Sequence, residues 1–212
     1  MFRKFIATAV VALSLGVSAT SASAAVTPVL PTYSEVNAVA YGPHWILNNF
    51  KDYSYQNNLA SVFNDLGADR TWFRISAVNV SLPSSYGEDL VVTIKNDKGQ
   101  YLSQWSNQNP AVNGWRARWD WVNGNVIDVP AVQWILVPNG SYYNLVDVSS
   151  INNSDGPYAL TIAQGGSTKE TNGVPDWSDL VLLPLSQTDK FQLFNFVNPS
   201  AQFPAPTGTS SD

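Results

Sequence analysis

Cysteine is absent from the 212-residue sequence, and charged residues make up only 13% of it. The lack of cysteine excludes a disulfide framework, a thiolate nucleophile and any zinc site that needs cysteine ligands. Eleven Lys and Arg residues stand against sixteen Asp and Glu residues, which gives a formal net charge of −5. Nucleic acids and anionic membrane surfaces both require clustered cations. The composition therefore argues against a nucleic-acid partner and against binding to an anionic membrane.

Histidine is nearly absent as well, since His44 is the single one in the chain. No second histidine can join it in a metal site, and no calcium-loop or phosphate-loop spacing is present. We therefore expect no cofactor, no metal and no enzymatic activity. A Ser-His-Asp arrangement or a pair of glycosidase carboxylates would assemble only in the folded chain, so both stay open as alternatives.

The amino end has the layout of a signal peptide. Arg3 and Lys4 precede an apolar run from Phe5 to Val17, and small residues follow, ending in Ala22-Ser23-Ala24. The apolar run is too short to span a bilayer as a helix. We expect residues 1–24 to be removed and the mature chain to be secreted, extracellular or periplasmic. No second segment predicts a membrane anchor.

After residue 25 the sequence has the pattern of short strands and turns that is typical of an all-β protein. Short runs of Val, Ile, Thr, Tyr and Trp alternate with Asn, Gly, Pro and Ser, and sustained helical periodicity is missing. The clearest predicted strands are His44–Asn48, Thr71–Val78, Leu90–Lys95, Gln100–Trp105, Ala131–Val137, Tyr142–Val148, Tyr158–Ala163, Leu180–Leu185 and Lys190–Val197. We expect an extension at residues 25–40, one β domain at 41–197 and a disordered tail at 198–212.

A weak internal repeat runs through this domain, with an opening strand, a Leu-centred strand and an aromatic closing strand in each copy. The openings are Trp45–Asn49, Val92–Asn96 and Tyr143–Asp147; the second strands centre on Leu59, Leu102 and Leu160; the closings are Trp72–Ile75, Trp134–Val137 and Phe191–Phe194. The aromatic residue at the start of each closing strand, Trp72, Trp134 or Phe191, is predicted to lie in the core, as is Trp45.

Three copies of a four-strand unit resemble the β-trefoil of the ricin-B-like lectins and of the trefoil protease inhibitors, over residues 41–197. The resemblance is one of pattern. The lectins' Gln-x-Trp motif is absent, because Gln133 directly precedes Trp134 and the third copy has Phe191. The resemblance implies a β-trefoil fold and a lectin-like function. A β-sandwich or jelly roll shares the same strand cadence and is the alternative.

The segment Trp115–Val122 alternates with period two before Asn123-Gly124, and we expect a half-exposed strand that returns along Val126–Val129. One face carries Trp115, Ala117, Trp119 and Trp121. We assign Trp119 and Trp121 together to the core and Trp115, at the start of the strand, to an exposed position. On the preceding strand, Tyr101 and Trp105 share the face opposite Leu102, so either the aromatic pair or the leucine is exposed.

The predicted ligand-binding residues combine an aromatic ring with a neighbouring carboxylate, because a flat ring accepts the C–H face of a sugar while a carboxylate accepts its hydroxyl hydrogens. Most of them lie around the long loops of the third repeat, where binding residues concentrate. The set is Trp115, Tyr142, Asp155, Tyr158, Asp176 and Trp177.

These features together predict a secreted, non-catalytic, lectin-like protein whose partner is a glycan or a cell-surface glycoconjugate. A secreted inhibitor of the trefoil kind, and a toxin or adhesion component that binds a host receptor, are the alternatives, and in these the partner is a protein. A proline-stiffened exposed loop would favour the inhibitor, and Leu82-Pro83-Ser84-Ser85 is the candidate loop.

Overall fold

The computed structural model describes residues 32–40, 45–48, 60–64, 73–87, 89–105, 115–154, 156–163, 170–171, 174–175 and 177–197. The expected signal peptide and carboxyl tail lie outside these residues. The described chain is all-β, as predicted. Its helices are single 3-10 turns, and none has the length and apolarity needed to cross a membrane.

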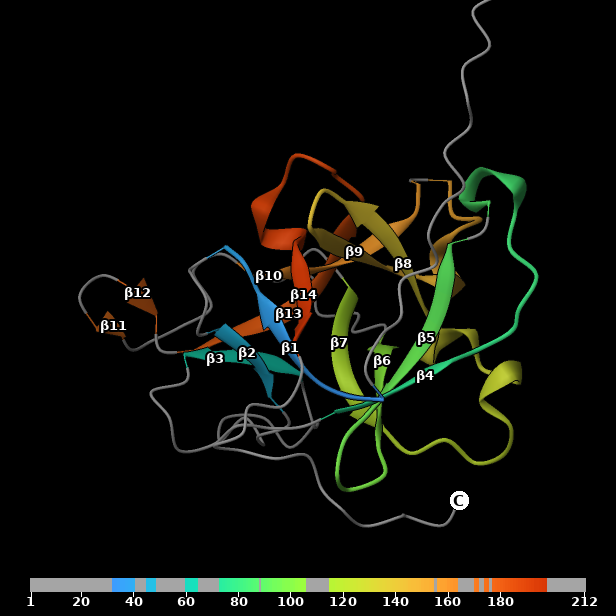
Figure 1. Cartoon of the computed structure of the whole chain (residues 1–212), viewed down its shortest axis with the longest axis horizontal. Coiled ribbons are helices and arrows are strands. Elements are labelled where there is room, and N and C mark those ends of the chain that lie inside the picture. Colours follow the sequence, from blue (N-terminus) through green and yellow to red (C-terminus); the bar gives the residue numbers. More distant parts are fainter. Residues whose placement is uncertain are drawn as a thin grey trace, which may run out of the picture.

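The strands are short and antiparallel (Figure 1). They are β1 (Tyr33–Ala38), β2 (Trp45–Asn48), β3 (Ser61–Asn64), β4 (Phe73–Ala77), β5 (Leu90–Lys95), β6 (Tyr101–Trp105), β7 (Trp115–Asp120), β8 (Trp134–Asn139), β9 (Tyr142–Asp147), β10 (Tyr158–Ile162), β11 (Glu170–Thr171), β12 (Val174–Pro175), β13 (Trp177–Pro184) and β14 (Phe194–Val197). The 3-10 turns are η1 (Ser84–Tyr86), η2 (Val126–Asp128), η3 (Pro130–Val132), η4 (Val148–Ser150) and η5 (Lys190–Gln192).

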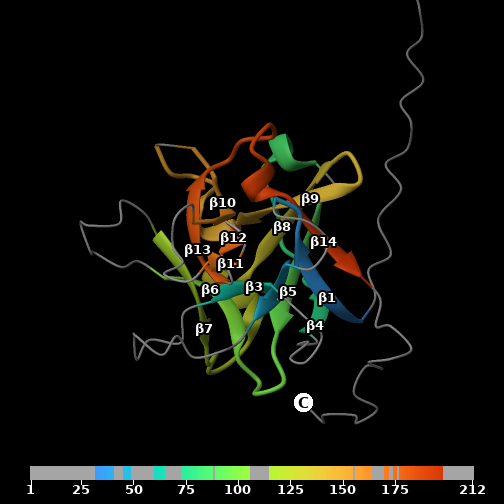
Figure 2. The ribbon, with the colours of Figure 1, turned by 90° about the vertical axis from the view of Figure 1, so that its left-hand side faces the viewer.

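Hydrogen bonding closes the large sheet into a barrel (Figure 2). Seven strands form one ring, in the order β5, β6, β7, β13, β10, β9, β8 and back to β5. Six strands, β1, β4, β5, β8, β9 and β14, close a second ring that shares β5, β8 and β9 with the first. The β11–β12 hairpin forms a separate sheet, seen at the left edge of Figure 1.

Three strand pairs share one register, which identifies equivalent positions along the chain. The pairs that align with one another are Leu47 with Val62 in β2–β3, Leu102 with Trp119 in β6–β7, and Leu160 with Leu182 in β10–β13. The first residues of β4, β8 and β14 are equivalent in the same way, because Phe73, Trp134 and Phe194 face Ser34, Val92 and Tyr143.

The observed repeat differs from the predicted one in two of its three copies. The first copy opens with β1, which pairs with β14 and β4, although its residues belong to the expected 25–40 extension. Leu47, and not Leu59, is equivalent to Leu102 and Leu160. The third closing strand begins at Phe194 because Lys190–Gln192 form η5, so Phe191 does not occupy the equivalent position.

The core fills the barrel with large side chains that come from the equivalent positions. Phe73, Trp134 and Phe194 are each 0% exposed. The rings of Phe73 and Trp119 stack with centroids 5.2 Å apart and an interplanar angle of 1°. The predicted core position of Trp134 is therefore confirmed; Trp72 lies outside the described residues, as does the side chain of Trp45.

The segment after β7 differs from the predicted hairpin. Val126–Asp128 is the 3-10 turn η2, and β7 pairs with β6 and β13 instead of with a return strand. The Nε2 of Gln133 donates to the carbonyl oxygens of Val126 (2.6 Å) and Ile127 (2.9 Å). The side chain of Gln133 thus supplies the hydrogen bonds that these two carbonyl groups would receive from a neighbouring strand in a hairpin. This segment therefore forms a fixed loop between β7 and β8.

Candidate functional site

The outer face of the β6–β7 pair carries a mixture of aromatic and charged side chains. Leu102 is 0% exposed and points into the core, so Tyr101 and Trp105 share the outer face. This settles the choice that the sequence leaves open. Tyr101 lies opposite Asp120 and Trp105 lies opposite Arg116. Directly opposed residues of an antiparallel pair project from the same face, so these side chains form one surface.

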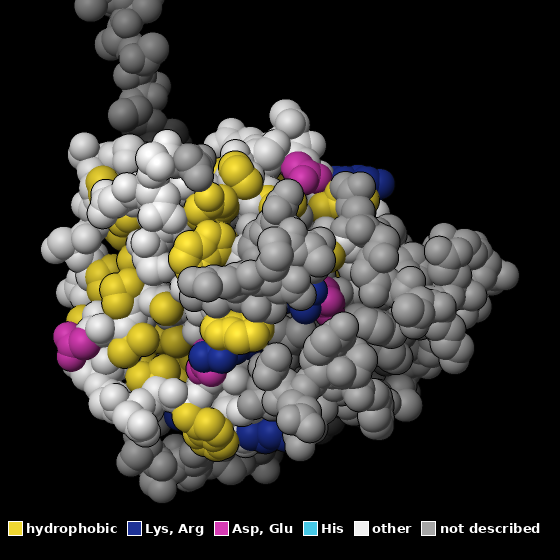
Figure 3. Space-filling view, turned by 180° about the vertical axis from the view of Figure 1, so that it is seen from behind, with side chains coloured by type: hydrophobic (Ala, Val, Ile, Leu, Met, Phe, Trp, Pro, Cys, Tyr) yellow, Lys and Arg dark blue, Asp and Glu magenta, His cyan; other side chains and the backbone are white. Residues whose placement is uncertain are grey.

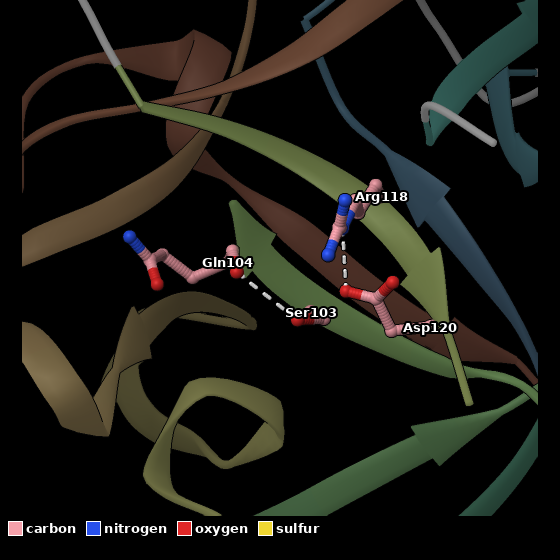
Figure 4. A network of polar contacts seen from close by, with 4 residues as sticks. All are labelled: Ser103, Gln104, Arg118 and Asp120. Carbon is pink, nitrogen blue, oxygen red and sulfur yellow. Dashed lines mark hydrogen bonds and ion pairs between the residues drawn. The ribbon is translucent and has the colours of Figure 1, made fainter. Parts of the chain in front are cut away.

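Arg118 links the aromatic and acidic parts of this surface. Its Nε donates to Oδ2 of Asp120 at 2.6 Å, and its guanidinium lies 4.9 Å from the centre of the Trp105 ring. Figure 4 shows Arg118 and Asp120 joined on β7, with Ser103 and Gln104 on the neighbouring strand β6. The ion pair is partly exposed, so its main effect is to fix the orientation of both side chains.

Trp121 ends this surface and is its most exposed ring. Its side chain is 65% exposed, the largest value among the exposed large hydrophobic residues of the described chain. The ring lies beside Gly99 in the β5–β6 turn, because a Cβ atom built on Gly99 would lie 3.1 Å from Cζ3 of Trp121. The prediction that Trp121 belongs to the core with Trp119 is wrong for Trp121 and right for Trp119, which is 1% exposed.

A lysine and a tyrosine connect the indole to the rest of the surface. Lys95, the last residue of β5, lies opposite Tyr101, and its Nζ is 5.3 Å from the centre of the tyrosine ring. We call Lys95, Tyr101, Trp105, Arg118, Asp120 and Trp121 the hairpin surface. Mixed exposed apolar and charged side chains also occur on the face that Figure 3 shows, which lies opposite the view of Figure 1. A surface that combines flat rings with oriented charges suits a polar ligand that has apolar faces.

The predicted ligand residues do not form one cluster. Trp115 is exposed at 36%, as expected, but it begins β7 whereas Trp121 follows its end. Tyr142 begins β9, while Tyr158 lies beside the last residue of that strand because Ala159 pairs with Val146. At about 3.3 Å per residue, the two tyrosines are separated by roughly 16 Å along β9.

The other predicted residues are described in part or not at all. Trp177 is the first residue of β13 and pairs with Phe63, although we expected it in a loop. Its side chain, Asp155 and Asp176 lie outside the described residues. Among the residues that the structure describes, no group of three or more His, Cys, Asp or Glu side chains could hold a metal ion.

Gly99 offers a direct test of how Trp121 is held. It has a φ of +81°, and a Cβ there meets the indole at 3.1 Å, whereas at Gly140, with a φ of +64°, nothing lies within 4 Å. Both Gly→Ala variants should cost about 1 kcal/mol through the left-handed backbone. Only Gly99→Ala should also shift the indole, measured as a change in tryptophan fluorescence of the folded state. An equal change in Gly140→Ala would contradict this placement.

The comparisons with known proteins concern the fold. No family model matches the chain, and no curated protein sequence matches it. The structure is similar to the Rhizoctonia solani agglutinin, with a TM-score of 0.51, 16% identity, and coverage of 80% of this chain and 97% of that chain. It is also similar to a Caenorhabditis elegans protein with unknown function, with a TM-score of 0.51, 9% identity, and coverage of 78% and 93%. At these identities the likeness is one of fold, and it shows that this all-β chain shares its fold with an agglutinin.

Proposed function

We propose that this chain is an exported, non-catalytic β-trefoil protein that binds carbohydrate through the hairpin surface. The strand pairings support the trefoil assignment. Three pairs with one register, β2–β3, β6–β7 and β10–β13, accompany a closed ring of six strands. That arrangement is what three copies of a four-strand unit produce. The fold shared with an agglutinin supports the lectin-like assignment.

The observation that carries the proposal is the exposed indole of Trp121 beside oriented polar groups. The side chain of Trp121 is 65% exposed, so its flat ring is accessible to a ligand that stacks on it. The Cζ3 and Cη2 atoms of the ring lie against the β5–β6 turn at Gly99, which holds this part of the indole in place. Asp120, held by Arg118, is positioned to accept hydrogen bonds from sugar hydroxyl groups.

The structure favours this binding mode over the protease inhibitor. The candidate inhibitory loop exposes Pro83, Ser84 and Ser85, but Ser84–Tyr86 form the 3-10 turn η1. Leu82 and Tyr86 pack against a second apolar cluster on the barrel, which holds the loop in that turn. A segment that is to lie across a protease cleft as substrates do must be extended, and this loop is not.

Replacing Trp121 with alanine should reduce the affinity for saccharide about tenfold, because a stacked ring contributes on the order of 1.4 kcal/mol. A glycan array identifies the saccharide, and isothermal titration measures its affinity. Ile127→Ala is the matched control, since Ile127 is exposed at 48% in the same loop and outside the hairpin surface.

Trp115, which the sequence predicts to bind the ligand, provides a second variant whose saccharide affinity can be compared with that of Trp121→Ala. It lies at the opposite end of β7, so Trp115→Ala should leave the affinity at Trp121 unchanged. If Trp115→Ala abolishes binding while Trp121→Ala binds like wild type, the site lies at the other end of the hairpin. If no saccharide binds, the proposed function itself is wrong.

A further inference from the structure

Arg118 is held from two directions on the outer face of the β6–β7 pair. Its Nε donates to Oδ2 of Asp120 at 2.6 Å (Figure 4). Its guanidinium carbon lies over the ring of Trp105, 4.9 Å from the ring centre. The first contact fixes one edge of the guanidinium plane, and the second fixes its face. The protein therefore determines the orientation of the whole guanidinium group.

This orientation leaves hydrogen-bond donors of Arg118 for a ligand. A guanidinium group has N–H donors on Nε, Nη1 and Nη2 and no acceptor, and the pair with Asp120 uses Nε. Within the described part of the chain, no residue accepts a hydrogen bond from Nη1 or Nη2 of Arg118. The side chain is 31% exposed, so the guanidinium group lies at the surface of the molecule.

Donors and acceptors follow one another along β7. A carboxylate group accepts hydrogen bonds, whereas a guanidinium group only donates them. Asp120 and Arg118 are two residues apart, which separates their backbone positions by roughly 7 Å, a distance comparable to the length of one sugar unit. Trp121 directly follows Asp120. From Trp121 toward Trp105, the hairpin surface thus presents a ring, an acceptor and then fixed donors.

The stability of the fold gains little from this arrangement. The side chains of Arg118 and Asp120 are 31% and 27% exposed, and an ion pair at that exposure contributes little because water screens it. Ordering a long arginine side chain also costs conformational entropy. A ligand benefits from this order, because the entropy of the arginine side chain is already lost before the ligand binds.

We propose that Arg118 forms a second sugar subsite beside Trp121 and Asp120, so that the ligand of the hairpin surface is a linear oligosaccharide and not a single terminal sugar. The inference rests on the proposed function and specifies the size of its ligand. One sugar unit stacks on Trp121 and donates to Asp120, and hydroxyl or glycosidic oxygens of the next unit accept from Nη1 and Nη2 of Arg118. Trp105 is a positioning residue that supports the guanidinium group.

The test compares sugars of increasing length by isothermal titration. The probes are N-acetylglucosamine, glucose and mannose, each with its β1,4-linked dimer and trimer. In a series that binds, the dimer or trimer should bind about tenfold more tightly than the monosaccharide, which is the effect of about one charge-assisted hydrogen bond. A glycan array makes the same comparison for other saccharides, because glycans that share a terminal sugar should be retained more strongly as they lengthen.

Arg118→Lys should remove most of this length dependence. The lysine ammonium group can still pair with Asp120, so the monosaccharide affinity should stay within about twofold of wild type, whereas the planar Nη donors are lost. The matched control is Arg116→Lys, two residues away on β7, because Nη1 of Arg116 lies 3.7 Å from Oδ2 of Asp179 and its side chain is only 13% exposed. This control should keep the length dependence. Trp105→Leu, which removes the ring beside Arg118 but no donor, should weaken the trimer and spare the monosaccharide.

The outcomes separate this inference from the proposed function. Equal affinities for monosaccharide and trimer, with both lost in Trp121→Ala, overturn the inference and keep the function. A length dependence that Arg118→Lys leaves unchanged, or that Arg116→Lys removes to the same extent, also overturns it, because the effect would then not come from the donors of Arg118. If none of these probes and no saccharide on a glycan array binds, both proposals fall.

Discussion

Replacement of Trp134 with alanine should lower the free energy of unfolding by about 3–5 kcal/mol, the cost of removing a fully buried large aromatic side chain. Trp134 is 0% exposed in the barrel core. Its Nε1 donates a hydrogen bond of 3.0 Å to the carbonyl oxygen of Leu102, which truncation would leave without this donor. Urea titration followed by circular dichroism measures the change.

A second substitution at Trp134 separates packing from hydrogen bonding. Trp134→Phe keeps a ring, as the equivalent positions Phe73 and Phe194 do, but it removes the donor to Leu102. Trp134→Phe should lower the free energy of unfolding by about 1–3 kcal/mol, which is less than the effect of Trp134→Ala. Trp121→Ala should unfold within about 0.5 kcal/mol of wild type, because its ring is exposed. A normal urea midpoint for Trp134→Ala would contradict the core described above.

The second large effect concerns Asp147 and pH. Burial raises the pKa of this carboxyl group from its usual value of 3.8 to about 6, although hydrogen bonds from Oγ and the backbone N of Ser149 act in the opposite direction. The folded state therefore holds a proton at Asp147 that the unfolded state has lost between about pH 4 and pH 6. The contribution of Asp147 to the free energy of unfolding is therefore complete below pH 4, and it is lost as the pH rises from 4 through 6.

Asp147→Asn should remove this loss and raise the free energy of unfolding at pH 7 by at most about 3 kcal/mol, from 1.36 kcal/mol per pKa unit. The amide keeps an oxygen for the backbone N of Ser149, and the Ser149 hydroxyl group can instead accept from the new NH₂ group. Asn96 shows that an amide suits such a turn, because its Oδ1 accepts from the backbone N of Lys98 and Gln100.

Urea titrations of wild type and Asp147→Asn at several values between pH 4 and pH 8 test this prediction. The gain should be absent near pH 4, grow between pH 4 and pH 6, and level off above pH 6. The exposed Asp128, on η2, provides the control variant Asp128→Asn, which should unfold like wild type. A pH-independent difference between wild type and Asp147→Asn would mean that Asp147 titrates normally.

Several core positions could be predicted because local alternation determines them. Trp119 faces inward on β7 with the predicted period of two, whereas the same period left the direction of Leu102 on the adjacent strand open. The first strand was missed for a physical reason: its segment follows a stretch rich in Pro and Thr, and it is ordered by β14 and β4, which are distant in sequence. Propensity carries no information about such partners.

The hairpin surface was harder to predict than the core. Trp121 continues the spacing of Trp115, Ala117 and Trp119, but β7 ends at Asp120, so the alternation no longer determines the direction of its side chain. Tyr101 and Asp120 lie in separate predicted strands, and their pairing depends on a register that no local pattern specifies. The aromatic content was visible in the sequence, whereas the placement of charge beside it was not.

The common register of the three strand pairs also shows whether the residues of the hairpin surface recur at the equivalent positions. Asp120 faces Tyr101, and the equivalent pairs are Leu183 with Ala159 and Phe63 with Ile46. Pro184 and Asn64 occupy the positions equivalent to Trp121. The described β2–β3 and β10–β13 pairs therefore do not repeat the residues of the hairpin surface, and the proposed saccharide site would occur once among the three pairs. Bridging two glycan-bearing cells by this surface would require at least two chains, and avidity would depend on their association rather than on the internal repeat.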